Sequence, residues 1–277
     1  MIAAVAALLW WDHHLQQTQV VPVGVPLGAL TLLLVVLGYR ELAHLAKARL
    51  LPVELTSGVV CSVILAAMPV WLQLIPAQAG LTPMDQATLP LLVLGGALAI
   101  VFFMQMARHR TEQAIQRLAG TLLGVIYLGG MGAAILAVRV RFGMPATLLF
   151  LAVVKFTDMG AYFTGSFFGK HKLIPWLSPG KSWEGLGGGL AAAAIVSIVL
   201  SLSFGIMQTL WQAALFGVLV GLVGQFGDLC ESLLKRDAGI KDSGAIVPGF
   251  GGVLDIVDSL LITAPLTYLL LMAWRHW

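Results

Sequence analysis

The stretch TLWQAALFGVLVGLVGQFGD, residues 209–228, carries no charged side chain before its last residue, Asp228. A helix of about 20 predominantly apolar residues covers about 30 Å, which is the thickness of the hydrocarbon core of a bilayer. We therefore predict that this stretch crosses a membrane as a helix and that Asp228 lies at the membrane boundary.

Working outward, seven more runs have the same length and character: 22–39, 56–76, 89–106, 119–138, 145–164, 185–207 and 256–273. Residues 1–11 are also apolar but too short to cross by themselves, and they lack the basic start and cleavage site of a signal peptide. We count them as a shortened ninth span. With 59% hydrophobic and 10% charged residues, the composition excludes an ordinary soluble domain. The predicted fold is all-α, a polytopic transmembrane helical bundle of about eight or nine spans.

No internal repeat or long linker divides the chain, so we predict a single membrane-embedded domain, 1–277. Residues 1–145 supply the N-terminal spans, and residues 146–277 supply the C-terminal spans and the loops that carry the candidate site. The glycine run 185–189 opens a span. It favours close helix packing over a phosphate-binding loop, because no strand precedes it.

The basic residues are unevenly distributed between the loops. Four loops, 40–55, 107–118, 165–184 and 229–255, hold 12 of the 16 lysines and arginines. Arg139, Arg141 and Arg275 are the cations on the alternate connections. Lysine and arginine are retained on the cytoplasmic side of a membrane. The sequence therefore predicts a multi-pass protein of the inner (cytoplasmic) membrane with these four loops in the cytoplasm.

Residues 227–259 contain six of the 13 acidic residues of the chain, between two apolar runs. Buried charges cost several kcal/mol unless they are paired, solvated or bound to metal, so this cluster predicts a functional site. Asp228 ends one span and Asp255 begins the next, and Asp255 and Asp258 share a helix face. Carboxylates gathered in this way suit Mg²⁺, and we predict that Asp228 and Asp255 bind it. Alternatively, Asp258 forms a cap or a salt bridge within the bundle.

Cations and glycines lie between these acids. Lys235, Arg236 and Lys241 suit phosphate binding, or else they form a plain basic loop. The turn Pro248–Gly252 has three glycines in four residues, whose backbone amides can approach a phosphate.

A second charged patch includes Asp158 and the segment Ser178–Gly185. Lys155 and Asp158 stand three residues apart in an apolar helix, which predicts an intrahelical ion pair. Asp158 alternatively faces a bound nucleotide.

The segment from Ser232 to Asp258 resembles the signature of the phosphatidate cytidylyltransferases, the CDP-diacylglycerol synthases. The residues in register with that signature are Ser232, Lys235, Arg236, Lys241, Asp242, Gly251, Gly252, Asp255 and Asp258. Segments 227–232, 178–185 and 158–165 also resemble the family. The similarity extends from about residue 150 onward, whereas the N-terminal half matches only in having many spans.

The resemblance implies transfer of CMP from CTP to phosphatidic acid in the membrane, giving CDP-diacylglycerol and pyrophosphate. It implies Mg²⁺ as cofactor, K⁺ as a possible second cation, no nucleic-acid partner, and a possible homodimer. The expected catalytic residues are Asp228, Ser232, Lys235, Asp255 and Asp258, with Asp228 and Asp255 as the metal ligands. The expected substrate-binding residues are Asp158, Lys181, Ser182, Glu184, Arg236, Lys241, Asp242, Gly251 and Gly252.

Three positions depart from the family pattern. Phe250 stands where the family usually has His, Ile256 where it usually has Arg, and Gly180 where it usually has a basic residue.

Two other functions stay open. A CTP-dependent lipid kinase of the polyprenol or phytol kind would transfer the γ-phosphate instead of CMP. An ion-coupled transporter would also account for charged residues such as Lys155 inside a span, but it would move its substrate without consuming CTP.

Overall fold

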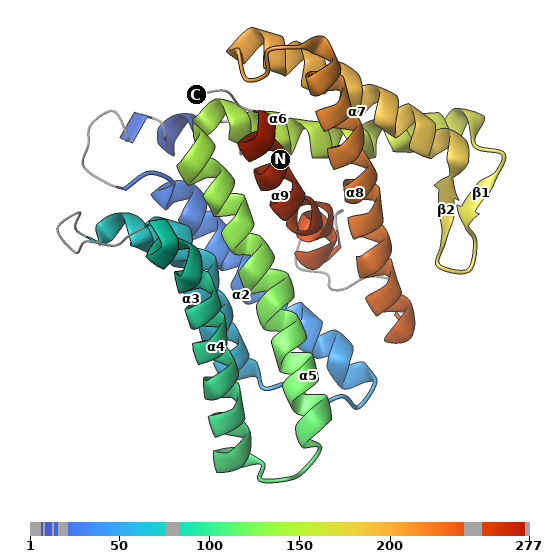
Figure 1. Cartoon of the computed structure of the whole chain (residues 1–277). Coiled ribbons are helices and arrows are strands. Elements are labelled where there is room, and N and C mark those ends of the chain that lie inside the picture. The colour runs from blue at the N-terminus through green and yellow to red at the C-terminus, as the bar shows by residue number, and fades with distance from the viewer. Residues whose placement is uncertain are drawn as a thin grey trace.

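The computed structural model describes residues 22–75, 83–240 and 251–274, together with 7, 9–12, 14 and 15. Its long helices are drawn in Figure 1. They are α2 (Val25–Ala48), α3 (Leu55–Trp71, continued by a 3₁₀ turn to Leu74), α4 (Pro83–Arg108), α5 (Ala114–Gly124), α6 (Met131–Phe168), α7 (Trp183–Phe204), α8 (Leu210–Asp237) and α9 (Leu254–Trp274). Among the described residues, seven helical segments are long and apolar enough to span a membrane. The predicted all-α membrane bundle is confirmed.

The seven segments account for all eight clear spans of the sequence analysis, because one of them is 55 residues long, Ala114–Phe168. It comprises α5, a π-helical segment at Val125–Gly130, and α6. The helix is broken at Gly143, whose φ of 79° is in the left-handed region that favours glycine. The chain changes direction there, at the top of Figure 1, so the two expected spans 119–138 and 145–164 are joined by a kink instead of a loop.

Arg139 is buried inside this joined segment and does not lie on a solvated connection as the sequence analysis expected. Its Nε donates a hydrogen bond of 2.6 Å to Asp12 Oδ2, and the other Asp12 oxygen accepts one from the Gly24 amide at 3.2 Å. A fully buried arginine requires such a partner. Most of residues 1–11 lie outside the described residues, so the ninth span stays a prediction.

A β-hairpin interrupts the helices between α6 and α7, where the sequence analysis expected only a loop. Strand β1 (Lys172–Ile174) pairs antiparallel with β2 (Ser178–Ser182), with Lys172 opposite Ser182. The hairpin extends along the right-hand edge of Figure 1 and contains Lys181 and Ser182, two of the expected substrate-binding residues.

The glycine run at the start of α7 packs directly on α6. A Cβ atom added to Gly188 would lie 2.0 Å from Thr164 Oγ1, and one added to Gly189 would lie 2.9 Å from the Thr157 carbonyl oxygen. Only glycine permits so close an approach of the two backbones. The predicted packing role of this run is therefore confirmed.

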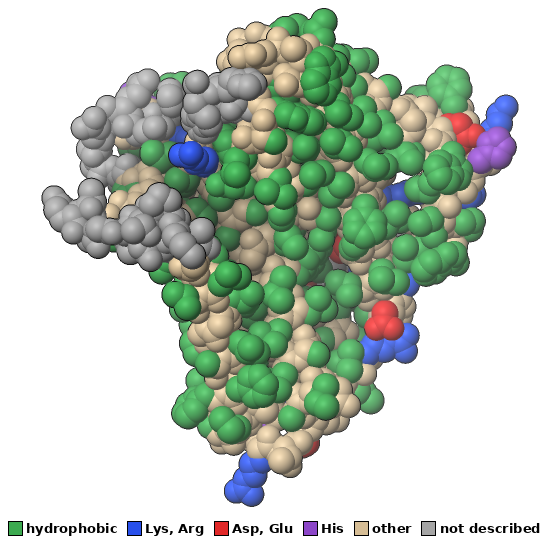
Figure 2. Space-filling model, viewed as in Figure 1, with side chains coloured by type: hydrophobic (Ala, Val, Ile, Leu, Met, Phe, Trp, Pro, Cys, Tyr) green, Lys and Arg blue, Asp and Glu red, His purple; other side chains and the backbone are tan. Residues whose placement is uncertain are grey.

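The surface of the molecule is largely apolar. Figure 2 shows hydrophobic side chains over most of the visible face, and the charged side chains gather mainly at its lower and right-hand edges. Leu91, Leu92 and Phe103 on α4 are each more than half exposed. Such a surface is unfavourable in water and favourable in lipid, which agrees with a multi-pass membrane protein.

The four cation-rich loops contact one another at one end of the bundle. Arg108 in loop 107–118 pairs with Glu54 in loop 40–55 at 2.7 Å. Arg49 in loop 40–55 donates to the carbonyl of Asp237 in loop 229–255, and Arg236 next to it donates to the Leu177 carbonyl in loop 165–184 at 3.3 Å. The contacts agree with the prediction that all four loops lie on the same side of a membrane.

Candidate active site

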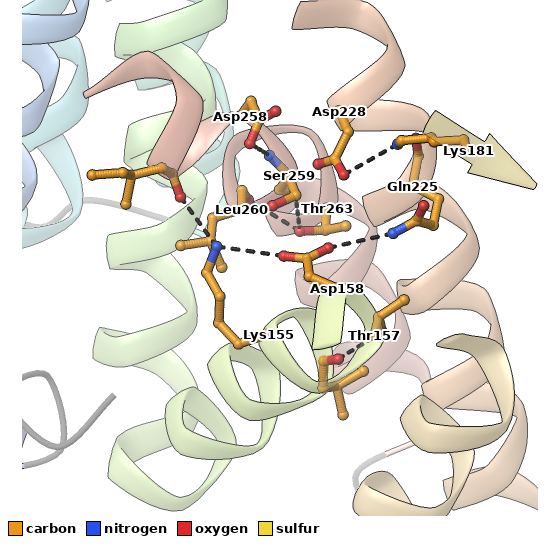
Figure 3. A network of polar contacts seen from close by, with 12 residues as sticks. Lys155, Thr157, Asp158, Lys181, Gln225, Asp228, Asp258, Ser259, Leu260 and Thr263 are labelled. Carbon is orange, nitrogen blue, oxygen red and sulfur yellow. Dashed lines mark hydrogen bonds and ion pairs between the residues drawn. The ribbon is translucent and has the colours of Figure 1, made fainter. Parts of the chain in front are cut away.

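Helices α8 and α9 almost touch at the acidic cluster. A Cβ atom on Gly227 would lie 3.0 Å from the Cα of Ser259 and 3.1 Å from the Asp258 carbonyl oxygen. This close approach brings Asp228 beside the first turn of α9. Figure 3 shows Asp228 and Asp258 on these facing helices, with Asp158 of α6 below them.

Two lysines pair with these acids from opposite sides. Lys181 Nζ, on the hairpin, lies 3.1 Å from Asp228 Oδ2 and donates to the Gln225 carbonyl at 3.1 Å. Lys155 Nζ, on α6, lies 3.5 Å from Asp158 Oδ2, which confirms the predicted intrahelical ion pair. This group, which we call the inner cluster, consists of Lys155, Asp158, Lys181, Asp228 and Asp258. Asp158 and Asp228 each pair with a lysine, whereas Asp258 accepts a hydrogen bond of 2.6 Å from the Ser259 amide.

Asp255 belongs to a neighbouring group. Its Oδ1 pairs with Lys235, and its Oδ2 accepts a hydrogen bond from the Gly252 amide at 2.8 Å. Lys235 also pairs with Glu231 Oε2 at 2.7 Å. Here two carboxylates face one ammonium group. The sequence analysis did not select Glu231, although its spacing of four residues before Lys235 on one helix is a pattern that favours an ion pair.

Glu41 on α2 is a second residue that the sequence analysis missed. Its two carboxylate oxygens accept hydrogen bonds from the amides of Val253 and Leu254, both at 2.8 Å. The side chain is buried. The first amides of a helix have no partner within the helix, so Glu41 caps α9 and fixes the turn that carries Asp255 and Asp258.

A cavity of about 510 Å³ lies between α6, the hairpin, α7 and α8. Its lining includes Asp158, Lys181, Ser182 and Asp228. Ser182 also caps α7, because its Oγ accepts a hydrogen bond from the Gly185 amide at 3.1 Å. The cavity therefore combines two carboxylates, an ammonium group and a helix N-terminus.

Not all predicted residues face this cavity. Glu184 supports the base of the hairpin, with Oε1 2.6 Å from His171 Nδ1. Ser232 is half-buried one turn after Asp228, and Arg236 is exposed. Gly251 has a φ of 86° and precedes Gly252 beside Asp255. Lys241, Asp242 and Phe250 lie outside the described residues.

A sequence profile described as "Cytidylyltransferase family" matches residues 5–274. The chain belongs to the cytidylyltransferase family. It is 32% identical over 231 residues to a phosphatidate cytidylyltransferase of Staphylococcus saprophyticus, which is 83% of this chain and 87% of the relative. It is 42% identical over 123 residues to a phosphatidate cytidylyltransferase of Mycobacterium bovis, 44% of this chain and 40% of the relative. It is 41% identical over 130 residues to the uncharacterized protein YnbB of Escherichia coli; the aligned part is 47% of this chain and 43% of the relative.

The cytidylyltransferase profile extends over the N-terminal spans as well as the signature. It therefore includes α2, whose Glu41 caps α9. The N-terminal half thus contributes directly to the site.

The chemistry of the site suits a divalent cation in this cytidylyltransferase. No three His, Cys, Asp or Glu side chains of the described residues gather closely enough to hold a metal by themselves. Mg²⁺, however, typically takes one or two protein carboxylates and completes its shell with water and substrate phosphates. Both groups contain more carboxyl than ammonium groups, so a divalent cation bound there would have oxygen ligands of opposite charge in a partly buried site. The residues present therefore fit Mg²⁺.

Proposed function

We propose that this protein transfers CMP from CTP to phosphatidic acid, forming CDP-diacylglycerol and pyrophosphate. The observation that carries this proposal is the cavity of about 510 Å³ lined by the ion pair of Lys181 and Asp228. Asp228 follows Gly227, where α8 packs against α9 at Asp258 and Ser259. Relatives named phosphatidate cytidylyltransferase support it.

In this reaction a phosphate oxygen of phosphatidic acid attacks the α-phosphorus of CTP. A new P–O bond forms, the bond from the α-phosphorus to the bridging oxygen breaks, and pyrophosphate leaves with that oxygen. The attacking oxygen is already ionised at neutral pH, so the site requires no strong general base. Its main task is to bring two polyanions together, which calls for positive charge.

The lysines of the site meet this need. Lys181 is on the cavity wall, where its ammonium group can donate to a phosphate as well as to Asp228. Lys235 is held between Glu231 and Asp255 at the start of the signature. Ser182 and the N-terminus of α7 provide donors at the same wall.

We assign Asp228 and Asp255 as the ligands of Mg²⁺, with K⁺ as a second cation. Bound there, the metal would neutralise phosphate charge during the transfer. Asp258 and Ser232 complete the proposed catalytic set. Asp158, Glu184, Arg236, Lys241, Asp242, Gly251 and Gly252 remain the proposed substrate-binding residues.

We place the protein in the inner membrane as a homodimer with the site facing the cytoplasm, where CTP is available. The mutual contacts of the four cation-rich loops support this orientation.

The test uses purified protein with Mg²⁺, phosphatidic acid, and CTP labelled either in cytidine or in the γ-phosphate. We expect the cytidine label in lipid and release of pyrophosphate. Asp255→Asn, which keeps the size but removes the charge, should lower turnover at least about a hundredfold.

The matched control is Asp237→Asn, which changes an exposed acid at the C-terminal end of α8 and should retain activity. Transfer of the γ-phosphate label instead would identify a lipid kinase. Equal turnover in Asp255→Asn and the unsubstituted protein would remove Asp255 from the proposed metal site.

A further inference from the structure

Lys155 connects α6 to the first turn of α9. Its Nζ donates a hydrogen bond of 3.2 Å to the carbonyl oxygen of Ile256, which lies between the two signature aspartates Asp255 and Asp258. The same Nζ is 3.5 Å from Asp158 Oδ2, as Figure 3 shows. The sequence predicted only the second of these contacts.

Two helices thus hold the start of α9 through different backbone groups. Glu41 of α2 holds the Val253 and Leu254 amides, whereas Lys155 of α6 holds the Ile256 carbonyl. The side chain of Lys155 is only 17% exposed. A partly buried ammonium group with two oxygen partners has little freedom to move, so it is a fixed support for this turn.

The two lysines of the inner cluster differ in position. Lys181 is on the wall of the cavity, within reach of a bound phosphate. Lys155 is not among the residues that line the cavity; it pairs with Asp158 and interacts electrostatically with Asp258. Lys155 therefore remains a counter-ion of the acids when Lys181 turns to a substrate.

We propose that Lys155 is a positioning residue that holds the first turn of α9 and whose fixed positive charge limits the affinity of the inner cluster for divalent cations. Its part in turnover depends on the proposed nucleotidyl transfer. Its effect on cation binding does not depend on that proposal.

Charge balance gives the direction of the expected effect. The inner cluster has three carboxylates and two ammonium groups, and a neutral residue at 155 leaves three against one. A divalent cation then binds more tightly, because a repelling charge has been removed at short range. Turnover falls at the same time, because the turn that carries Asp255 and Asp258 loses a support. A purely structural role would instead weaken cation binding together with turnover.

The experiment measures Mn²⁺ binding by electron paramagnetic resonance on purified, substrate-free protein in detergent. Lys155→Met, close in size but uncharged, should lower the Kd for Mn²⁺ by roughly threefold or more. Lys155→Arg should keep the Kd near that of the unsubstituted protein. Lys155→Met combined with Asp158→Asn restores the charge balance and should return the Kd toward the unsubstituted value.

The control is Lys170→Met, which removes an exposed lysine outside the cluster and should leave the Kd unchanged. If Lys155→Met does not fold, the double variant compared with Asp158→Asn alone gives the same test, and the double variant should bind Mn²⁺ more tightly. Unchanged or weaker binding in a folded variant without Lys155 overturns the inference, and so does an unsubstituted protein that binds no Mn²⁺. If the binding pattern holds but no CDP-lipid forms, the proposed function fails and the charge role of Lys155 stands.

Discussion

At the scale of single residues, a substitution of Glu41 tests whether the N-terminal half holds the start of α9 in place. Glu41→Gln keeps the shape but places an amide group against the Val253 and Leu254 amides, so one of the two hydrogen bonds is lost. The expected cost is about 1–3 kcal/mol in the stability of this turn. We expect faster hydrogen exchange of these two amides, and roughly tenfold lower kcat with little change in KM for CTP, because Glu41 holds α9 instead of lining the cavity.

Glu112→Gln, an exposed acid in loop 107–118, is the control for Glu41 and should change neither quantity. Unaltered exchange in Glu41→Gln would show that the cap does not stabilise the turn.

The sequence predicted the acids of the signature because they lie close together in the chain. It did not predict Glu41, because a contact across 212 positions leaves no local pattern.

At the scale of elements, the packing of α7 on α6 provides a matched pair of substitutions. Gly188→Ala places a methyl group against Thr164 and should separate the two helices, at a cost of about 1–3 kcal/mol. Gly187→Ala, one residue earlier, meets no atom within 4 Å and should be neutral or slightly stabilising. Thermal unfolding in detergent measures both. Similar melting temperatures for the two variants would contradict close packing at this position.

The helices followed from the sequence because an apolar run of about 20 residues has few alternatives in a bilayer. The kink at Gly143 and the β-hairpin did not. The kink is a break at Gly143, which adopts a left-handed φ, and the apolar pattern does not distinguish such a break from a loop between two helices. Strand β1 has only three residues, too few to form an alternating pattern that sequence analysis can distinguish from a loop.

At the scale of the whole molecule, the clustered cationic loops and the acidic site form one continuous end of the bundle. Arg236 connects the end of α8 to the hairpin, and Glu54 connects the ends of α3 and α4. The turn at 205–209 joins the other ends of α7 and α8. A bundle of this kind places the cavity and the cationic loops on one side of the membrane and this turn on the other.

This arrangement predicts opposite accessibility for two introduced cysteines. The two cysteines of the chain are first replaced, by Cys61→Ser and Cys230→Ser, so that only the introduced cysteine can react. In this background, Arg110→Cys should react with a membrane-impermeant maleimide only in inside-out vesicles. Gln208→Cys, exposed in the turn between α7 and α8, should react only in right-side-out vesicles or intact spheroplasts. Denatured samples, in which both sites label fully, control for reactivity. Labelling of both cysteines from the same side would contradict the arrangement of the bundle. Labelling of each cysteine from the side opposite to the expected one would place the acidic site away from cytoplasmic CTP. The positive charge of the loops and access to the nucleotide both require that the site faces the cytoplasm.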